Sequence, residues 1–181
     1  MEISICLSII TLNVNGLNST IKRHSVPEWI KNQDPSLCCL QEAHVRCKDT
    51  HSLKTERWKK IFHVNKKQKK AGAAILISDK IDFKTKTVTR DKNGCYIVKK
   101  ESVQWEDTVF VSIYAPNIEA PKYIKQILTD LKEEIDSNTK RVAYFNAPLT
   151  SMDRSFRQKI NKETLALNDT SDLMGLTDIH R

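Results

Sequence analysis

Residues 3–17 read ISICLSIITLNVNGL, an isoleucine-rich run that ends in asparagine and glycine. The apolar part indicates a buried strand over Ile3–Leu12, and the stretch Asn13–Gly16 has the composition of a turn. A second compact apolar run, Leu37–Gln41, predicts another strand, and Glu42 follows it directly. Polar side chains therefore follow both strands at the point where each should end.

The rest of the chain predicts further strands with helices between them. Ser25 and Glu28 have the spacing of a capping box, with Pro27 in the first turn, so we expect a short helix that ends near Gln33. Strands are expected at residues 58–64, 73–77, 83–89, 96–99, 108–114 and 141–145, and helices at 120–136 and 156–167. This order predicts an α/β or α+β layered fold in a single domain, residues 1–181.

The composition excludes several classes of protein. Of the 181 residues, 39% are hydrophobic and 29% are charged, which fits a globular chain and not a disordered one. No apolar run reaches the roughly 18 residues that cross a bilayer, and the apolar opening lacks the basic flank of a signal peptide. The five cysteines, an odd number, indicate a reducing compartment, cytoplasmic or nuclear.

The excess of positive charge lies in one stretch. The formal net charge is +8, and residues 44–70 contain ten basic and two acidic side chains, whereas the rest of the chain is neutral. The stretch includes Lys66, Lys67, Lys69 and Lys70, between two strands of an expected hairpin. Such a patch attracts the phosphates of DNA or RNA. A solvated hairpin tip has the same composition, so charge leaves both interpretations open.

Polar residues follow several of the predicted strands. They are Asn13, Asn15, Glu42, Tyr114, Asn117 and Asn146. Strand ends that meet at one edge of a sheet are where α/β proteins build sites, and carboxylate and carboxamide oxygens suit Mg²⁺. The alternative is that each asparagine is simply a turn former.

A zinc site is the rival interpretation. Cys39, His44, Cys47 and His51 are zinc-ligand side chains in a C-x4-H-x2-C-x3-H pattern. Cys39, however, lies in an expected buried strand, where a free cysteine behaves as a small hydrophobic residue. The chain also contains no C-x2-C pair.

Four segments occur in an order that is specific to one family. They are TLNVNGL (11–17), CCLQE (38–42), IYAPN (113–117) and FNAPL (145–149). Together they closely resemble the endonuclease domain of the LINE retrotransposon second open reading frame. That domain belongs to the exonuclease-endonuclease-phosphatase family, with the apurinic endonucleases and pancreatic deoxyribonuclease, and the likeness runs from about Ile9 to Arg181.

The resemblance implies a two-sheet sandwich flanked by helices and Mg²⁺-dependent nicking of one DNA strand. In that family the glutamate matching Glu42 holds the metal, and the asparagine matching Asn13 supports the metal and the phosphate. The residues matching Tyr114 and Asn146 contact the reacting phosphate, and the arginine matching Arg154 contacts DNA. The cation neutralises charge that develops on the phosphate and the leaving oxygen.

The chain departs from this family at two points. The family motif Gly-Asp-Phe-Asn reads Ala-Tyr-Phe-Asn over residues 143–146, so Tyr144 replaces the catalytic aspartate. A phenol ionises only at about pH 10 and cannot act as that carboxylate, and losing such a group typically costs about 10² to 10⁴ in rate. The chain ends at Arg181, before the family's Ser-Asp-His motif, so we also expect the last strands and the catalytic histidine to be missing.

These departures leave three hypotheses open. The first is an inactive endonuclease-like domain that still binds DNA or RNA through the lysine-rich hairpin. The second is an interaction module, or an unstable remnant, whose open sheet edge needs a partner chain. The third is a weak residual Mg²⁺-dependent nuclease.

Overall fold

Eight strands and three helices make up the part of the chain that the computed structural model describes. That part is residues 7–17, 19–44, 53, 58, 60–65, 72–80, 82, 84–90, 96–103, 106–113, 120–134, 140–145 and 162–176. In chain order the elements are β1 (Ile9–Asn13), α1 (Thr20–Gln33), β2 (Leu37–Gln41), β3 (Lys60–Asn65), β4 (Gly72–Ile77), β5 (Lys84–Arg90), β6 (Tyr96–Val103), β7 (Glu106–Ile113), α3 (Ala120–Glu134), β8 (Lys140–Phe145) and α4 (Lys162–Leu173).

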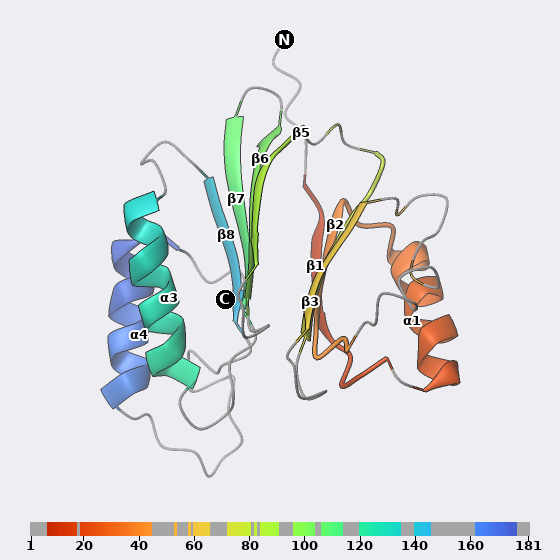
Figure 1. Cartoon of the computed structure of the whole chain (residues 1–181), viewed down its shortest axis with the longest axis horizontal. Helices are drawn as coiled ribbons and strands as arrows, with labels where there is room; N and C mark the ends of the chain where they lie inside the picture. The colour runs from red at the N-terminus through yellow and green to blue at the C-terminus, as the bar shows by residue number, and fades with distance from the viewer. Residues whose placement is uncertain are drawn as a thin grey trace.

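The strands form two four-stranded sheets, in the orders β1-β2-β4-β3 and β5-β6-β7-β8. β1 runs parallel to β2 and β7 runs parallel to β8, whereas all other neighbours are antiparallel. A parallel pair needs a long crossover connection, and α1 and α3 lie in those two connections. The sheets lie face to face, with α1 outside one sheet and α3 and α4 outside the other (Figure 1). The predicted fold, two sheets flanked by helices, is confirmed.

Alternating residues of β2 and β4 build two separate apolar layers. The layer between the sheets contains Leu37, Cys39, Val64, Ala73, Ile75, Ile77, Ile97 and Phe110. The layer beneath α1 contains Val14, Leu17, Ile30, Cys38, Leu40, Ala43, Leu53, Trp58, Ala74 and Leu76. Odd-numbered residues of both strands belong to the first layer and even-numbered residues to the second, as the period of two in a strand requires. Both strands are therefore buried on both faces.

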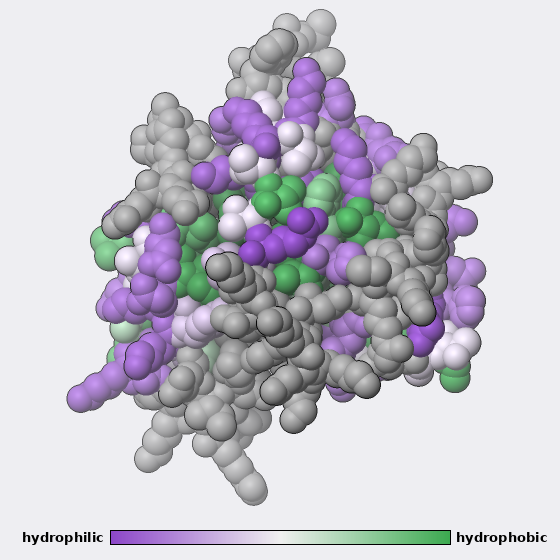
Figure 2. Space-filling model, viewed as in Figure 1, coloured by the Kyte–Doolittle hydropathy of each residue, from purple (hydrophilic) through white to green (hydrophobic). Residues whose placement is uncertain are grey.

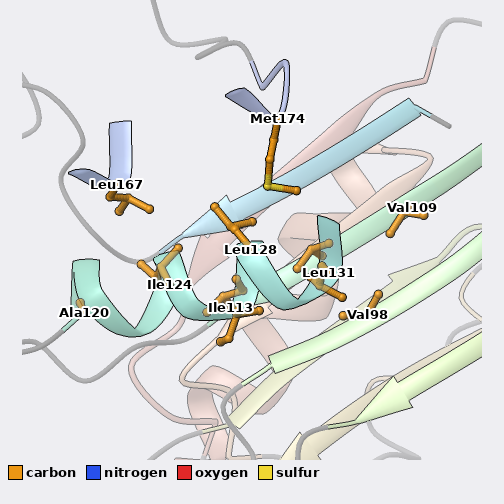
Figure 3. Close-up of a cluster of buried hydrophobic side chains, with 11 residues drawn as sticks. Val98, Val109, Ile113, Ala120, Ile124, Leu128, Leu131, Leu167 and Met174 are labelled. Atoms are coloured by element: carbon orange, nitrogen blue, oxygen red, sulfur yellow. The ribbon is translucent and has the colours of Figure 1, made fainter. Parts of the chain in front are cut away.

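The third apolar layer joins the second sheet to α3 and α4 (Figure 3). It contains Val98, Val109, Val111 and Ile113 from the strands, Ala120, Ile124, Ile127, Leu128 and Leu131 from α3, and Leu167 and Met174 from the α4 region. The apolar spacing that predicts a helix from residue 120 is confirmed, because these α3 residues share the buried face. Within the described residues, no helix is long and apolar enough to cross a membrane.

The bounds of α1 differ from the prediction. The helix begins at Thr20, because the Ser19 hydroxyl accepts a hydrogen bond from the Lys22 backbone N–H at 3.2 Å and caps the first turn. The proposed cap at Ser25 is wrong, and Pro27 lies inside the helix instead of in its first turn. The predicted end of the helix at Gln33 is confirmed.

Other elements also differ from their predicted bounds. α4 runs to Leu173 and not to residue 167, and Gly175 follows it with a positive φ of 65°. The Gly175 and Leu176 N–H groups bond the carbonyls of Asp172 and Ser171, which is the Schellman end of a helix. β1 begins at Ile9, and residues 3–6 and 156–161 of the predicted elements lie outside the described part.

Candidate functional site

β1 and β2 end side by side, and the first candidate pair forms there. The two strands are parallel, with Asn13 opposite Gln41, so Asn13 and Glu42 reach the same edge of the sheet. The Asn13 Nδ2 donates a hydrogen bond to the Glu42 Oε1 at 3.0 Å. The Asn13 Oδ1 accepts a hydrogen bond from the Asn15 backbone N–H, also at 3.0 Å. The structure thus brings two of the predicted site residues together.

The loops that follow β1 and β2 are bonded to each other. The Gly16 N–H donates to the Glu42 carbonyl at 2.7 Å, and the Leu17 N–H donates to the Ala43 carbonyl at 3.1 Å. Asn15 and Glu42 both have left-handed backbones, with φ of 45° and 52°. Such conformations cost about 1 kcal/mol or more for a residue other than glycine. The surrounding hydrogen bonds must therefore hold this strained edge in place.

Gln41 joins the two sheets at this edge. Its side chain is fully buried, and its Nε2 donates to the Ile113 carbonyl at the end of β7 at 2.9 Å. Ile113 lies opposite Phe145 in the parallel pair β7–β8, so both of those strands end here as well. Four strands therefore end together, two from each sheet. The sequence pattern gives no sign that Gln41 belongs to this edge.

The layer between the sheets is polar just below this edge. Ser112 and Gln41 are both fully buried, and in the described part of the chain the Ser112 Oγ and the Gln41 Oε1 have no hydrogen-bond partner. Leaving such an atom unsatisfied typically costs about 1–3 kcal/mol. Tyr144 lies in β8 opposite Ser112, one residue before the edge.

A buried lysine lies in the same layer. Lys99 of β6 is fully buried, and its Nζ lies 3.8 Å from the centroid of the Phe62 ring, a cation–π contact. Lysine is rarely buried to this degree. The sequence gives no sign of this burial, because Lys99 and its neighbour Lys100 are both of a residue type that is ordinarily exposed.

The side-chain oxygens at this edge are of the type that binds a hard cation such as Mg²⁺. Glu42 is half-buried, and its Oε2 has no hydrogen-bond partner among the described residues, whereas Asn13 already holds the Oε1. Carboxylate and carboxamide oxygens are the ligands of Mg²⁺. In the described segments no three His, Cys, Asp or Glu side chains gather as a metal cluster. Glu42 is therefore the carboxylate on which a cation site here would depend.

The zinc hypothesis receives no support from Cys39. Its side chain belongs to the apolar layer between the sheets, and burial raises the pKa of the thiol to about 12. Zinc binds the thiolate, so this environment opposes metal binding. Cys47 and His51 lie outside the described residues.

The remaining predicted site residues also lie outside the described part of the chain. They are Tyr114, Asn146, Arg154, Lys66, Lys67, Lys69 and Lys70. In the sequence, Tyr114 and Asn146 directly follow β7 and β8, which end at the shared edge. The four lysines lie between β3 and β4, which pair antiparallel as the predicted hairpin requires.

Comparisons with known proteins agree with this architecture. The sequence model of the Endonuclease/Exonuclease/phosphatase family matches residues 10–170. An AP endonuclease from Leishmania major superimposes with a TM-score of 0.68 at 14% identity, over 93% of this chain and 66% of that one. Humanized TDP2 from D. rerio gives 0.62 at 13%, over 77% and 65%. TDP2 from C. elegans gives 0.60 at 18%, over 82% and 50%.

At 13–18% identity, the similarity between this chain and the solved structures shows a shared fold alone. The chain spans between half and two thirds of the length of the three solved chains. A shared fold therefore does not show that this chain has the activity of those proteins.

Proposed function

Since the chain belongs to the Endonuclease/Exonuclease/phosphatase family, we propose that it is an endonuclease-like domain of the LINE retrotransposon type that binds nucleic acid but no longer cleaves it. The observation that carries this proposal is the Asn13–Glu42 hydrogen bond at the edge where four strands end. The four ordered sequence motifs support the LINE type, since two of them supply Asn13 and Glu42.

Glu42 is the residue that would hold a divalent cation, with Asn13 fixing its carboxylate. The hydrogen bond from the Asn13 Nδ2 occupies one carboxylate oxygen and leaves the other for the metal. A bound Mg²⁺ would supply Lewis-acid stabilisation of charge on a phosphate. Tyr114 and Asn146 follow strands that end at the same edge, which supports a role for them in contacting that phosphate.

The loss of cleavage rests on Tyr144. This residue replaces the carboxylate that prepares the attacking water in the family, and a neutral phenol cannot take up that proton at pH 7. The chain keeps Asn13 and Glu42 although Tyr144 stands in place of the aspartate. Binding of a cation and of phosphate is thus separable from hydrolysis.

Nucleic-acid binding is assigned to Lys66, Lys67, Lys69 and Lys70, with Arg154. The test is a fluorescence-anisotropy titration of labelled duplex DNA and RNA at several salt concentrations. The double variant Lys66→Glu/Lys67→Glu should weaken binding and reduce the slope of log K against log salt by about 1.8, since each phosphate contact contributes about 0.9. A matched control places the same charge reversals at Lys122 and Lys125, exposed residues of α3. If the two double variants bind alike, the hairpin is not the contact.

Nicking of supercoiled plasmid tests the loss of hydrolysis. With Mg²⁺ and with a chelator, the chain should give no more nicked circle than its Glu42→Ala variant. Nicking that requires Mg²⁺ and disappears in Glu42→Ala would instead establish a residual nuclease and refute the proposed loss.

Among the described strands β1 lies at the edge of its sheet, and this favours a second candidate function, that of an interaction module. Every residue of β1 is half-buried or exposed, whereas every residue of β2 is buried. The Ser8 carbonyl accepts from the Leu37 N–H, and the Val14 N–H donates to the Gln41 carbonyl. Even-numbered residues therefore direct their N–H and C=O groups toward β2, and those of Ile9 and Thr11 point away from the sheet. Hydrophobic residues reach the surface between the two sheets (Figure 2). Such an edge can pair with a strand of a partner chain.

Thr11→Pro tests this candidate, because proline removes an N–H that points away from β2 and leaves the β1–β2 bonds in place. Sedimentation over a range of concentrations should show assembly of the parent that Thr11→Pro abolishes and Thr11→Val retains. A parent that stays monomeric and captures no strand peptide would refute the module.

A further inference from the structure

Lys22 reaches from the first turn of α1 to the loop that follows β1. Its Nζ donates hydrogen bonds to the carbonyls of Val14 and Asn15, at 3.0 and 3.1 Å. The side chain is half-buried, so its position is fixed more closely than that of a solvated lysine. Hydrogen bonds from a charged donor are stronger than those from a neutral one. Lys22 therefore holds two successive peptide groups of this loop.

These peptide groups determine where the Asn13 side chain lies. Asn15 has a left-handed backbone, and its N–H donates to the Asn13 Oδ1 at 3.0 Å. The Asn13 Nδ2 in turn donates to the Glu42 Oε1. A continuous set of hydrogen bonds thus runs from the Lys22 ammonium through the turn to the Glu42 carboxylate. Each step depends on the backbone conformation that Lys22 stabilises.

Neighbouring bonds hold other parts of the loop. The Arg23 Nε donates to the Leu17 carbonyl at 2.9 Å, at the far end of the same loop. The Gly16 N–H donates to the Glu42 carbonyl. Lys22 is the α1 side chain that bonds the part of the loop nearest Asn13, so its removal should affect Asn13 before the rest of the loop.

We propose that Lys22 is a positioning residue for the Asn13–Glu42 pair. Its ammonium fixes the turn that places the Asn13 amide against one oxygen of Glu42, and this leaves the other oxygen available to a divalent cation. This inference rests on the proposed cation site. Groups that orient a metal ligand without touching the metal typically alter affinity by about 10- to 100-fold when removed.

The test compares Lys22→Met, which keeps the length of the side chain without its charge, with Lys22→Arg, which keeps the charge. Lys31→Met is the matched control, because Lys31 is exposed in the last turn of the same helix. Mn²⁺ serves as the probe, with its affinity measured by electron paramagnetic resonance. Lys22→Met should weaken Mn²⁺ binding by about tenfold or more, Lys22→Arg should restore most of the affinity, and Lys31→Met should change nothing.

A second readout separates this inference from the proposed cation site. In a ¹⁵N–¹H spectrum recorded without metal, the Asn13 side-chain amide should shift in Lys22→Met but not in Lys31→Met. If the parent chain binds no Mn²⁺, the cation site fails, and the Asn13 signal alone decides the role of Lys22. An unchanged Asn13 signal, or equal Mn²⁺ affinity in Lys22→Met and the parent, overturns the proposal. Lys22→Gln replaces Lys22→Met if the latter does not fold.

Discussion

Ile75→Ala tests whether the two sheets pack as one core. Ile75 is fully buried in β4, the strand between β2 and β3, and it belongs to the layer between the sheets. Its cross-strand neighbours are Cys39 on one side and Phe62 on the other. All three side chains pack in the same layer. The site edge depends on this layer, because Gln41 crosses it to reach the second sheet.

The expected destabilisation follows from the burial of Ile75. The substitution removes three side-chain carbons. Burial of each contributes about 0.8 kcal/mol to the free energy of unfolding, or about 2.4 kcal/mol in total. A cavity adds to this, because hydrogen-bonded strands on both sides keep β4 from collapsing into the space. We therefore expect about 3–4 kcal/mol, which lowers the melting temperature of a chain of this size by about 6–16 °C.

Near-ultraviolet circular dichroism during a thermal melt measures this change. Trp58 is 2% exposed beneath α1 and reports fixed packing, whereas Trp29 is 43% exposed. Leu173→Ala is the control, since that side chain is 74% exposed and its removal should cost less than about 0.5 kcal/mol. Equal melting temperatures for Ile75→Ala and Leu173→Ala, or a parent without a cooperative transition, would refute the packed two-sheet core.

Three further outcomes are expected. The Cys39 thiol, whose pKa burial raises to about 12, should resist iodoacetamide at pH 8 in the folded chain and react in urea, as peptide mass spectrometry would show. Ser19→Ala should cost about 1 kcal/mol in urea unfolding, because it removes the cap on the Lys22 N–H; an unchanged midpoint would contradict the cap. Burial and the nearby Arg90 lower the pKa of His63, so protonation favours the unfolded chain and stability should fall as the pH drops below about 6.5. His63→Gln should lessen that fall in a series of melts from pH 7.5 to 5.5.

The sequence predicts those elements whose apolar pattern is set by packing. The α3 residues Ile124, Leu128 and Leu131 recur at helical spacing because one face of the helix packs on a sheet. α1 lacks such a pattern, since only Pro27 and Ile30 are buried in it. The start of α1 therefore depends on whether Ser19 or Ser25 caps the helix, and the residue type alone does not distinguish the two. The Gly175 that ends α4 was a usable signal that the prediction overlooked.

The candidate site could be predicted in part for a similar reason. Asn13 and Glu42 stand where apolar runs end, and parallel neighbours bring such positions to one edge. Gln41 carries no comparable signal, because the carbonyl that it bonds belongs to the other sheet. The burial of Lys99 also depends on that second sheet, through Phe62 of β3. Contacts between the sheets were beyond what strand patterns predict.

The Gln41–Ile113 hydrogen bond also bears on the order of folding events. It joins residues 72 positions apart, whereas β1 with β2, and β7 with β8, can each pair within their own half of the chain. Contacts between distant parts of a chain must overcome the largest loop-closure entropy and slow folding most. The edge that carries Asn13 and Glu42 should thus assemble late, after both halves have formed. A ligand bound there would stabilise the union of the two halves, and its binding would report complete folding.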